Sequence, residues 1–265
     1  MTLSVITVTW NSKDFILKQI ESVRNAVKNI EIEQIVVDNG SIDGTVQVIQ
    51  EKFSDVRVIV NKENKGFGAA NNQGVLISKG EYVLFLNPDM VLHPGSLDLF
   101  VDWMNKNNRA GIASPRLLDK QGNFNRDTAP RRFPRVWEQL AIVLKLPHLF
   151  PGLLGAYRME GFDSTREQEV DSVQGSCMLV RRELIEKLGY AFDPRYFIWF
   201  EDVDLCREAY RLGFTVVYTP VISAIDYSGQ SFKKRTTWWK QKQFITSMIV
   251  YFRKWGFGRV ESRKS

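Results

Sequence analysis

The sequence predicts an α/β fold in which a mostly parallel central sheet is flanked by helices. Two observations support this fold class. Short runs of continuous apolar, often β-branched residues alternate with helical patterns, and polar turn residues follow each apolar run. The 265 residues are 44% hydrophobic and 25% charged, an ordinary globular composition with enough apolar mass for one large core. Because parallel strands end at one edge of a sheet, we expect the polar residues after them to gather there, where such sheets bind ligands.

Four strand and helix pairs are expected in the first half of the chain. The strands cover residues 3–9, 35–37, 56–60 and 82–86, and the helices run from a cap at 11–12 to about 29, and over 45–53, 69–78 and 95–106. Further strands are expected at 111–118, 173–180 and 216–218, and further helices at 182–188 and 201–212. Residues 119–170 contain many glycines and prolines, so this stretch is expected to be a long, partly ordered insertion.

The last 30 or so residues form a basic tail. From Lys233 onward there are ten Lys and Arg against Glu261 alone, so the tail has a net charge of +9. Because the whole chain has a net charge of +6, the rest of the chain carries −3. Aromatic and apolar residues at helical spacing between 236 and 255 predict an amphipathic helix. This helix either packs its aromatic face on the core or lies on an anionic membrane surface. No nucleic-acid partner is expected, because no recognition motif accompanies the charge.

The cysteines and the amino terminus bear on the cellular compartment. Cys177 and Cys206 do not form a CxxC pair, so neither a zinc site nor a disulfide framework is indicated, and reduced, partly buried thiols are expected. The first four residues lack the basic segment of a signal peptide, and no apolar run is long enough to span a bilayer. The protein is therefore expected in the cytoplasm.

The first polar clusters at expected strand ends are residues 7–11 and 38–45. Asp38 closes a buried strand, so it is placed to accept the N–H of a pyrimidine ring or a ribose hydroxyl, although it could equally be a turn and N-cap residue. A third cluster covers residues 64–74, where small residues let the backbone approach a bulky ligand closely. Two consecutive asparagines at 71 and 72 are costly in a helix unless their amides are used. The alternative is a loop followed by an ordinary helix start.

Two acidic clusters follow. Asp89 ends the Asn-Pro-Asp turn after the strand at 82–86, where a carboxylate suits Mg²⁺ or Mn²⁺, whereas the alternative is a simple Asx-Pro turn. Residues 201–204 bring three carboxylates to the start of a helix, which the helix dipole favours on structural grounds alone. The aromatic run at 196–200 just ahead would shield a carboxylate from water and raise its basicity toward that of a general base.

Taken together, these clusters resemble the motifs of family 2 inverting glycosyltransferases, and most closely the bacterial rhamnosyltransferase-like branch. The likeness covers about residues 2–230 and rests on residues 5–11, 37–41, 64–74, 86–89 and 200–205. It implies a GT-A-type, Rossmann-like sheet followed by the amphipathic helical tail. It also implies a hexosyltransferase (EC 2.4) domain at 1–230, with a nucleotide-sugar-binding half at 1–115 and an acceptor-binding half at 116–230, ahead of the tail at 231–265.

The resemblance assigns roles to particular residues. The positions implied to bind the donor are Thr9, Asn11, Asp38, Asn64, Gly66, Asn72, Asn87 and Arg131. The positions implied on the acceptor side are Gly175, Trp199 and Glu201. Asp89 is implied to be the metal-binding second acid of the family's DxD element, and Asp202 the base that deprotonates the acceptor hydroxyl. The basic segment that begins at Arg131 would meet donor phosphates.

Two positions depart from the family pattern. Asn87 replaces the first acid of DxD, as is common in this branch. Asp226 stands where the family usually has the histidine of an HxxGxS segment, here residues 226–231. An aspartate still ligates Mg²⁺ or Mn²⁺ and would restore the charge lost at Asn87, so a divalent cation held by Asp89 and Asp226 is expected. His93 and His148 are given no role.

The resemblance also implies the partners. The donor would be a dTDP- or UDP-sugar, with rhamnose favoured by the branch, and the acceptor a saccharide or lipid-linked saccharide of the cell envelope. Contact of residues 236–255 with the inner face of the plasma membrane would fit such an acceptor. A noncatalytic nucleotide-sugar or glycan-binding domain is the alternative, supported by the replacement at Asp226. Nucleotidyl transfer is disfavoured, because residues 9–13 contain no glycine-rich phosphate loop.

Overall fold

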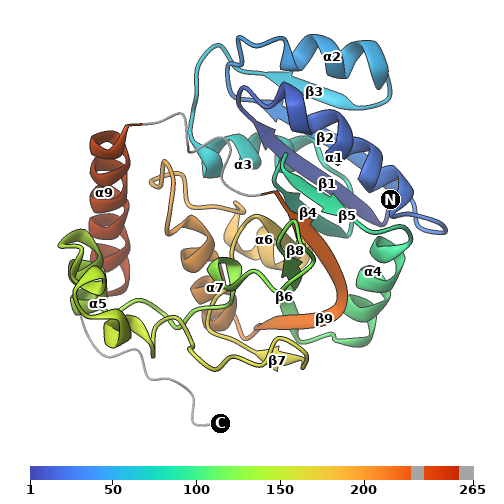
Figure 1. Ribbon diagram of the computed structural model, residues 1–265. Helices are drawn as coiled ribbons and strands as arrows, with labels where there is room; N and C mark the ends of the chain where they lie inside the picture. Colours follow the sequence, from blue (N-terminus) through green and yellow to red (C-terminus); the bar gives the residue numbers. More distant parts are fainter. Residues whose placement is uncertain (228–235, 257–265) are drawn as a thin grey trace.

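The computed structural model describes residues 1–227 and 236–256, and within these residues nine strands form a central sheet (Figure 1). The strand order is β3-β2-β1-β4-β8-β6-β9-β5, and β7 pairs with β9 off this path. The strands are Leu3–Thr9 (β1), Ile32–Asp38 (β2), Arg57–Val60 (β3), Tyr82–Leu86 (β4), Met90–Leu92 (β5), Ala110–Leu118 (β6), Gln168–Glu169 (β7), Cys177–Arg181 (β8) and Thr215–Asp226 (β9).

Helices cover both faces of this sheet. They are Lys13–Asn25 (α1), Thr45–Lys52 (α2), Phe67–Ile77 (α3), Ser96–Lys106 (α4), Val136–Val143 (α5), Arg182–Leu188 (α6), Glu201–Arg211 (α7) and Thr237–Trp255 (α9), with 3-10 turns at Arg126–Thr128 (η1), Leu146–His148 (η2) and Pro151–Leu154 (η3). Successive strand residues point to opposite faces. Val5 accordingly packs in the cluster that contains Phe100 of α4, whereas Ile6 packs in the cluster that contains Leu205 of α7.

The predicted α/β architecture is confirmed. In the first half of the sheet β1 pairs in parallel with β2 and β4, and β2 pairs in parallel with β3. The register places Thr9 opposite Asp38, so the polar residues at these two strand ends lie together as expected. In the second half β8 runs antiparallel to both β4 and β6, while β6 and β9 are parallel.

The structure differs from the predicted elements in several places. Helix α1 ends at Asn25 rather than near 29, and the strand expected from 173 begins at Cys177. The strand expected at 216–218 runs from Thr215 to Asp226, because β9 continues to pair with β6 after register shifts between Ala110 and Ile112 and between Ser114 and Arg116. Strands β5 and β7 and helix α5 were not predicted, since β5 has only three residues and β7 only two.

Helix α9 begins at an N-cap, where the hydroxyl of Thr236 accepts the N–H of Trp239. Its second half packs on the core: Tyr251 and Phe252 are buried in a cluster with Phe200. Its first half is open, and Trp238 is 72% exposed. The predicted amphipathic helix is therefore confirmed, and packing on the core accounts for its second half.

Some predictions fall outside the described residues. These are the domain boundary at 230/231, the part of the 226–231 motif from 228 onward, and the basic residues at 233–235 and 257–265. Among the described residues no helix combines the length and apolar character needed to cross a membrane. Cys177 and Cys206 are free thiols and fully buried, which agrees with the expectation of reduced cysteines.

Candidate active site

Two neighbouring cavities meet at Asn87, directly after β4. The first, here the β1 cavity, has a volume of about 140 Å³, and the predicted site residues that line it are Thr9, Asn64, Gly66, Asn87 and Asp89. The second, here the α7 cavity, has a volume of about 300 Å³, and the predicted site residues that line it are Asn87, Arg131, Gly175, Trp199, Glu201 and Asp202. Phe67 and Ile198 also line both cavities, so most of the predicted residues are brought into one continuous region.

The ends of β1 and β2 hold two buried oxygens that have no hydrogen-bond partner among the described residues. They are Oγ1 of Thr9 and Oδ1 of Asp38, and both side chains are fully buried. The other oxygen of Asp38 accepts the N–H groups of Gly40 at 3.1 Å and Ser41 at 2.9 Å. Asp38 therefore serves the turn, as one interpretation held, and keeps a second oxygen. Unsatisfied buried polar atoms are uncommon in native proteins and are explained where a ligand binds.

Asn11 joins the loops that follow β1 and β2. Its backbone is left-handed, with φ of 51°, and its N–H donates to Ser41 Oγ at 2.7 Å. Its side-chain oxygen accepts the N–H of Ile42 at 2.9 Å. These bonds hold the two loops together, so Asn11 fixes the shape of the edge on which Thr9 and Asp38 lie.

The backbone conformation and the close neighbours of residue 66 require a glycine there. Its φ is +90°, and a Cβ at this position would lie 2.4 Å from the carbonyl oxygen of Phe197. That same carbonyl accepts the N–H of Phe67 at 2.9 Å, and Asn64 Oδ1 accepts the N–H of Gly66 at 2.9 Å. The sequence suggested that small residues here admit a bulky ligand, whereas at Gly66 the group that approaches closely is the backbone of the aromatic run at 196–200.

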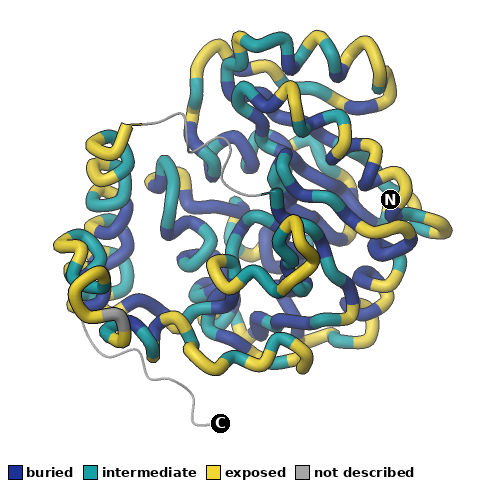
Figure 2. The backbone as a smooth tube through the Cα atoms, in the orientation of Figure 1, coloured by how far each residue is buried: buried dark blue, intermediate teal, exposed yellow. Residues whose placement is uncertain are grey.

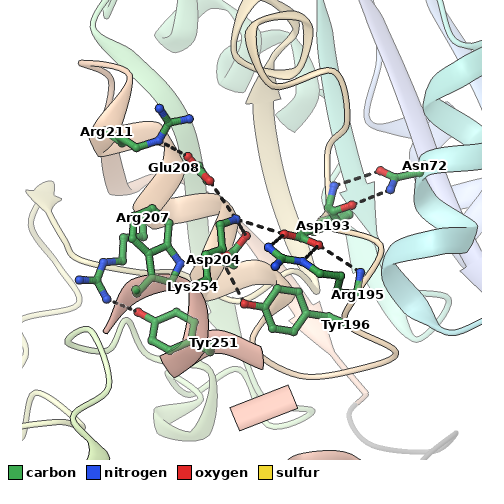
Figure 3. Close-up of polar contacts among 12 residues, drawn as sticks. Asn72, Asp193, Arg195, Tyr196, Asp204, Arg207, Glu208, Arg211, Tyr251 and Lys254 are labelled. Atoms are coloured by element: carbon green, nitrogen blue, oxygen red, sulfur yellow. Dashed lines mark hydrogen bonds and ion pairs between the residues drawn. The ribbon is translucent and has the colours of Figure 1, made fainter. Parts of the chain in front are cut away.

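Asn72 binds the main chain instead of lining a cavity. Its Nδ2 donates to the carbonyl oxygen of Phe192 at 2.6 Å, and its Oδ1 accepts the N–H groups of Ala191 and Phe192 at 3.1 and 3.0 Å (Figure 3). The expectation that the amide must be used in a helix is met by these bonds. Asn72 is not among the residues that line the two cavities, so its predicted part in donor binding is not supported by this position.

The turn at Asn87 and Asp89 lies between the cavities. The N–H of Asn87 donates to Ser176 O at 2.9 Å, and its carbonyl accepts the N–H of Met90 at 3.2 Å, which closes the turn. The Asp89 carbonyl accepts the N–H of Tyr227 at 3.0 Å, and Met90 pairs with Asp226 in the antiparallel β5 and β9 strands. Asp226 therefore lies near Asp89 in space. It is only 7% exposed and does not line either cavity.

These acids fit a cation that binds together with a phosphate-bearing ligand. Within residues 1–227 and 236–256, no group of three or more His, Cys, Asp and Glu side chains is arranged to hold a metal ion. Asp89 offers one carboxylate to the β1 cavity, while the carboxylate of Asp226 accepts a long bond of 3.4 Å from Asn125 Nδ2. Mg²⁺ commonly takes one or two protein carboxylates and completes its shell with water and substrate phosphates, so this donor set is suitable.

Asp202 lies at the start of α7 with its carboxylate held by the backbone. Its Oδ2 accepts the N–H of Gly175 at 3.1 Å, and its Oδ1 accepts the N–H of Val203 at 2.8 Å. The two residues before the helix, Trp199 and Phe200, have left-handed backbones with φ of 66° and 68°. Such conformations are costly for aromatic residues and cluster at functional sites, where the surroundings enforce them.

The electrostatics of the α7 cavity favour a basic carboxylate. Burial, followed by the negative charge of Asp202, raises the pKa of Glu201 well above its ordinary range. Burial also raises the pKa of Asp202, although the N–H groups that it accepts and the guanidinium of Arg131 act in the opposite direction. A carboxylate with a raised pKa at the wall of a cavity is suited to remove a proton from a bound hydroxyl.

Arg131 lies in the α7 cavity, next to the predicted base. Its Nη2 donates to the carbonyl of Asp127 at 3.0 Å, and its guanidinium carbon lies 5.9 Å from the ring centroid of Tyr157. The sequence linked Arg131 with donor phosphates, yet it lines the cavity that contains Asp202 and not the one that contains Asp89.

Two aromatic residues of α9 contribute to the cavities and were not predicted to do so. Trp239 lines the β1 cavity, with its ring centroid 5.8 Å from that of Phe197. Phe244 lines the α7 cavity, and its ring lies 5.3 Å from Phe200. The aromatic spacing of the tail was visible in the sequence, but not the surface against which it packs.

A buried charge cluster fixes the end of α9 (Figure 3). Lys254 Nζ lies 2.7 Å from a carboxylate oxygen of Asp204, 2.8 Å from Glu208 and 3.2 Å from Asp193. Burial alone would lower the pKa of Lys254, but the carboxylates of Asp204 and Glu208 outweigh it and raise the pKa. Asp204, one of the three carboxylates at the start of α7, is therefore structural.

The chain is similar in sequence and in fold to known proteins. Residues 4–189 match the family model described as glycosyl transferase family 2. The chain is 28% identical over 248 residues to the N-acetylglucosaminyl-diphospho-decaprenol L-rhamnosyltransferase of Mycobacterium tuberculosis, which covers 86% of this chain and 77% of the relative. It is 26% identical to the rhamnosyltransferase WbbL of Escherichia coli, over 90% of this chain and 89% of that protein.

Among solved structures, the fold is similar to that of S. aureus TarS in complex with UDP-GlcNAc. The TM-score is 0.60 at 17% identity, and the match covers 89% of this chain and 62% of that one. The chain therefore spans about three fifths of the length of this structural neighbour. At this level of identity the likeness concerns the fold.

Proposed function

This chain belongs to glycosyl transferase family 2 and is a glycosyltransferase, and on that premise we propose that it transfers a sugar from a nucleoside-diphosphate donor to a saccharide or lipid-linked saccharide with inversion of configuration. The observation that carries the proposal is the meeting of two cavities at Asn87, one with Asp89 and the other with Asp202 in its wall. Rhamnose as the sugar is supported by the names of two relatives.

In this proposal the donor occupies the β1 cavity. The nucleoside lies against the ends of β1 and β2, where the unpaired oxygens of Thr9 and Asp38 accept its N–H or hydroxyl groups. Asn64 and Gly66 line the same cavity, and Trp239 closes it from α9. A dTDP- or UDP-sugar has the pyrimidine that this edge suits.

The diphosphate then lies at the turn that follows β4. Asn87 orients it and Asp89, with Asp226 adding negative charge nearby, would hold the divalent cation. When bound, Mg²⁺ or Mn²⁺ would neutralise the charge that develops on the leaving diphosphate. Residues 1–115 supply all the donor contacts named here apart from Trp239 and Asp226.

The acceptor occupies the α7 cavity, which residues of the 116–230 half largely line. Asp202 removes the proton of the attacking hydroxyl, and its burial beside Glu201 raises the pKa of Asp202 and so keeps it basic. Gly175 orients the Asp202 carboxylate through its N–H, and Trp199 offers an aromatic face to a sugar ring. Attack from this cavity on a sugar held in the other cavity proceeds by direct displacement, which inverts the anomeric centre.

Donor turnover tests the proposal. With Mn²⁺, a dTDP- or UDP-sugar and a polyprenyl-linked or free saccharide acceptor, we expect release of nucleoside diphosphate that depends on the acceptor and is lost after chelation of the metal. NMR of the product should show the anomeric configuration opposite to that of the donor. Thermal protection by the donor without any release would indicate a noncatalytic binding domain, and retention of configuration would contradict direct displacement.

The pH dependence of transfer should report on Asp202. A base acts in its deprotonated form, so the rate falls as pH falls through its pKa, which burial raises above the ordinary 3.8. Because the charge of Arg131 lowers that pKa, Arg131→Gln should move the acid limb of kcat to higher pH. The matched control is Arg132→Gln, whose guanidinium pairs with Asp171 at 3.5 Å and should leave the limb in place. An acid limb that stays put or moves to lower pH in Arg131→Gln would contradict the assignment.

Membrane contact belongs to the same proposal. A lipid-linked acceptor, as in the name of the mycobacterial relative, requires the enzyme to work near a bilayer. The sequence pattern suggested this contact for residues 236–255, and the first half of α9 is largely exposed, with Trp238 near its start.

A further inference from the structure

Helix α5 buries two polar side chains and exposes large apolar ones. Glu138 and Gln139 are buried, with 3% and 1% of their surface exposed, whereas Trp137 and Leu140 are 49% and 45% exposed. The buried polar residues have local reasons: Glu138 accepts the N–H of Arg135 at 2.9 Å and closes the first turn, and Gln139 lines the α7 cavity. A helix in contact with water alone is expected to bury its apolar face instead.

The apolar exposure continues past the end of the helix. Leu144, Leu149 and Phe150 are 65%, 73% and 61% exposed. Together with Trp137 and Leu140 they form what we call the α5 surface, at the projecting corner beside α9 (Figures 1 and 2). Single exposed leucines are normal, but large apolar residues gathered on one surface mark a contact with a partner or a membrane.

The charged residues of the segment that carries the α5 surface are mostly basic. Between residues 131 and 158 the sole acid is the buried Glu138, and the bases are Arg131, Arg132, Arg135, Lys145 and Arg158. Helix α9, which packs against α5, adds Lys240, Lys242 and Arg253 and contains no Asp or Glu, while its Lys254 is used in the buried charge cluster. Trp, Phe and Leu on one face with Lys and Arg around them is the composition of a helix that lies in the interface of an anionic bilayer.

We propose that the α5 surface docks this protein on an anionic lipid bilayer, with its five apolar side chains among the headgroups and Arg135 and Lys145 at the lipid phosphates. The charge complementarity commits the surface to this partner. Docking would not involve a spanning segment, since none of the described helices can cross a membrane.

The placement of α5 connects this surface with the site. Gln139, on the inner side of the helix, lines the α7 cavity, so one helix about 10 Å across separates that cavity from the docked face. A lipid-linked acceptor could therefore enter the α7 cavity while its lipid stays in the bilayer. This consequence rests on the proposed function, whereas the bilayer contact itself does not.

Flotation of the full-length chain with vesicles tests the docking. We expect binding to phosphatidylcholine vesicles that contain phosphatidylglycerol, weak binding to phosphatidylcholine alone, and a decrease as salt is raised. The double variant Leu144→Glu/Leu149→Glu should weaken binding to anionic vesicles at least about tenfold, because apolar burial is replaced by repelled charge. The matched control is Leu76→Glu/Leu99→Glu, at side chains 84% and 54% exposed on α3 and α4, which should bind like the unmodified chain.

Several results would overturn the docking. They are an absence of binding to anionic vesicles at low salt, equal binding by Leu144→Glu/Leu149→Glu, or equal losses in both double variants. Sedimentation gives a further check, since a dimer that the α5 variant alone dissociates would make this surface an interface between two copies. Transfer to a water-soluble saccharide acceptor should be unchanged in the α5 variant. An unmodified chain that binds anionic vesicles but transfers no sugar would count against the proposed function alone.

Discussion

Asp202→Asn is expected to reduce sugar transfer by about 10²- to 10⁴-fold, because the group that removes the acceptor proton is lost. The substitution keeps the size of the side chain and one accepting oxygen for the N–H groups of Gly175 and Val203. It also removes a charge beside the buried Glu201, so the fold should be retained. Release of nucleoside diphosphate measures the loss, and the thermal shift produced by the donor measures binding.

The control for this variant is Asp102→Asn. Asp102 is an exposed carboxylate on α4 that pairs with Lys106 at 2.7 Å, away from both cavities, so transfer should be unchanged. Donor binding should survive in Asp202→Asn, since the residue lines the α7 cavity and not the β1 cavity. Transfer by Asp202→Asn within about tenfold of the unmodified enzyme would mean that another group is the base.

Lys254→Met is expected to lower the free energy of unfolding by about 3–5 kcal/mol. The ammonium group lies among Asp193, Asp204 and Glu208, whose side chains are only 4%, 1% and 6% exposed. Removing the cation leaves the buried Asp204 with the neutral donors Tyr196 and Trp255, while Asp193 and Glu208 keep Arg195 and Arg211. A buried charge that loses its partner costs more than the ion pair itself contributes. Urea unfolding measures the change.

Arg253→Met provides the comparison on the same helix. Arg253 is exposed, so its replacement should alter the free energy of unfolding by no more than about 0.5 kcal/mol. Because α9 also carries Trp239 and Phe244, Lys254→Met should weaken donor binding as well. A loss of stability in Lys254→Met as small as in Arg253→Met would show that the carboxylates do not depend on the lysine.

The core elements could be predicted because their patterns are local. Strand β4 and helix α6 have the predicted bounds, Tyr82–Leu86 and Arg182–Leu188, since a continuous apolar run and a short amphipathic run identify them without neighbours. Helix α5 could not be found in this way. Its exposed apolar residues and buried Glu138 and Gln139 reverse the pattern on which such predictions depend.

Some features of the candidate site could likewise be predicted from the sequence, and others could not. That Thr9 and Asp38 would lie together follows from the parallel order of their strands, because equivalent strand ends meet at one edge. The different uses of Asn72 and Gly66 do not follow, since each contacts the 191–197 segment more than a hundred residues away.

The sequence by itself determined the alternation of strands and helices and the polar residues at each strand end, because hydrophobic period and turn chemistry act over a few neighbouring residues. Only the tertiary structure decided how the carboxylates at the start of α7 are used. Asp202 faces a cavity, whereas Asp204 binds Lys254, fifty positions further along the chain. Contacts over such separations depend on how helices pack on the sheet, and packing leaves no local pattern in the sequence.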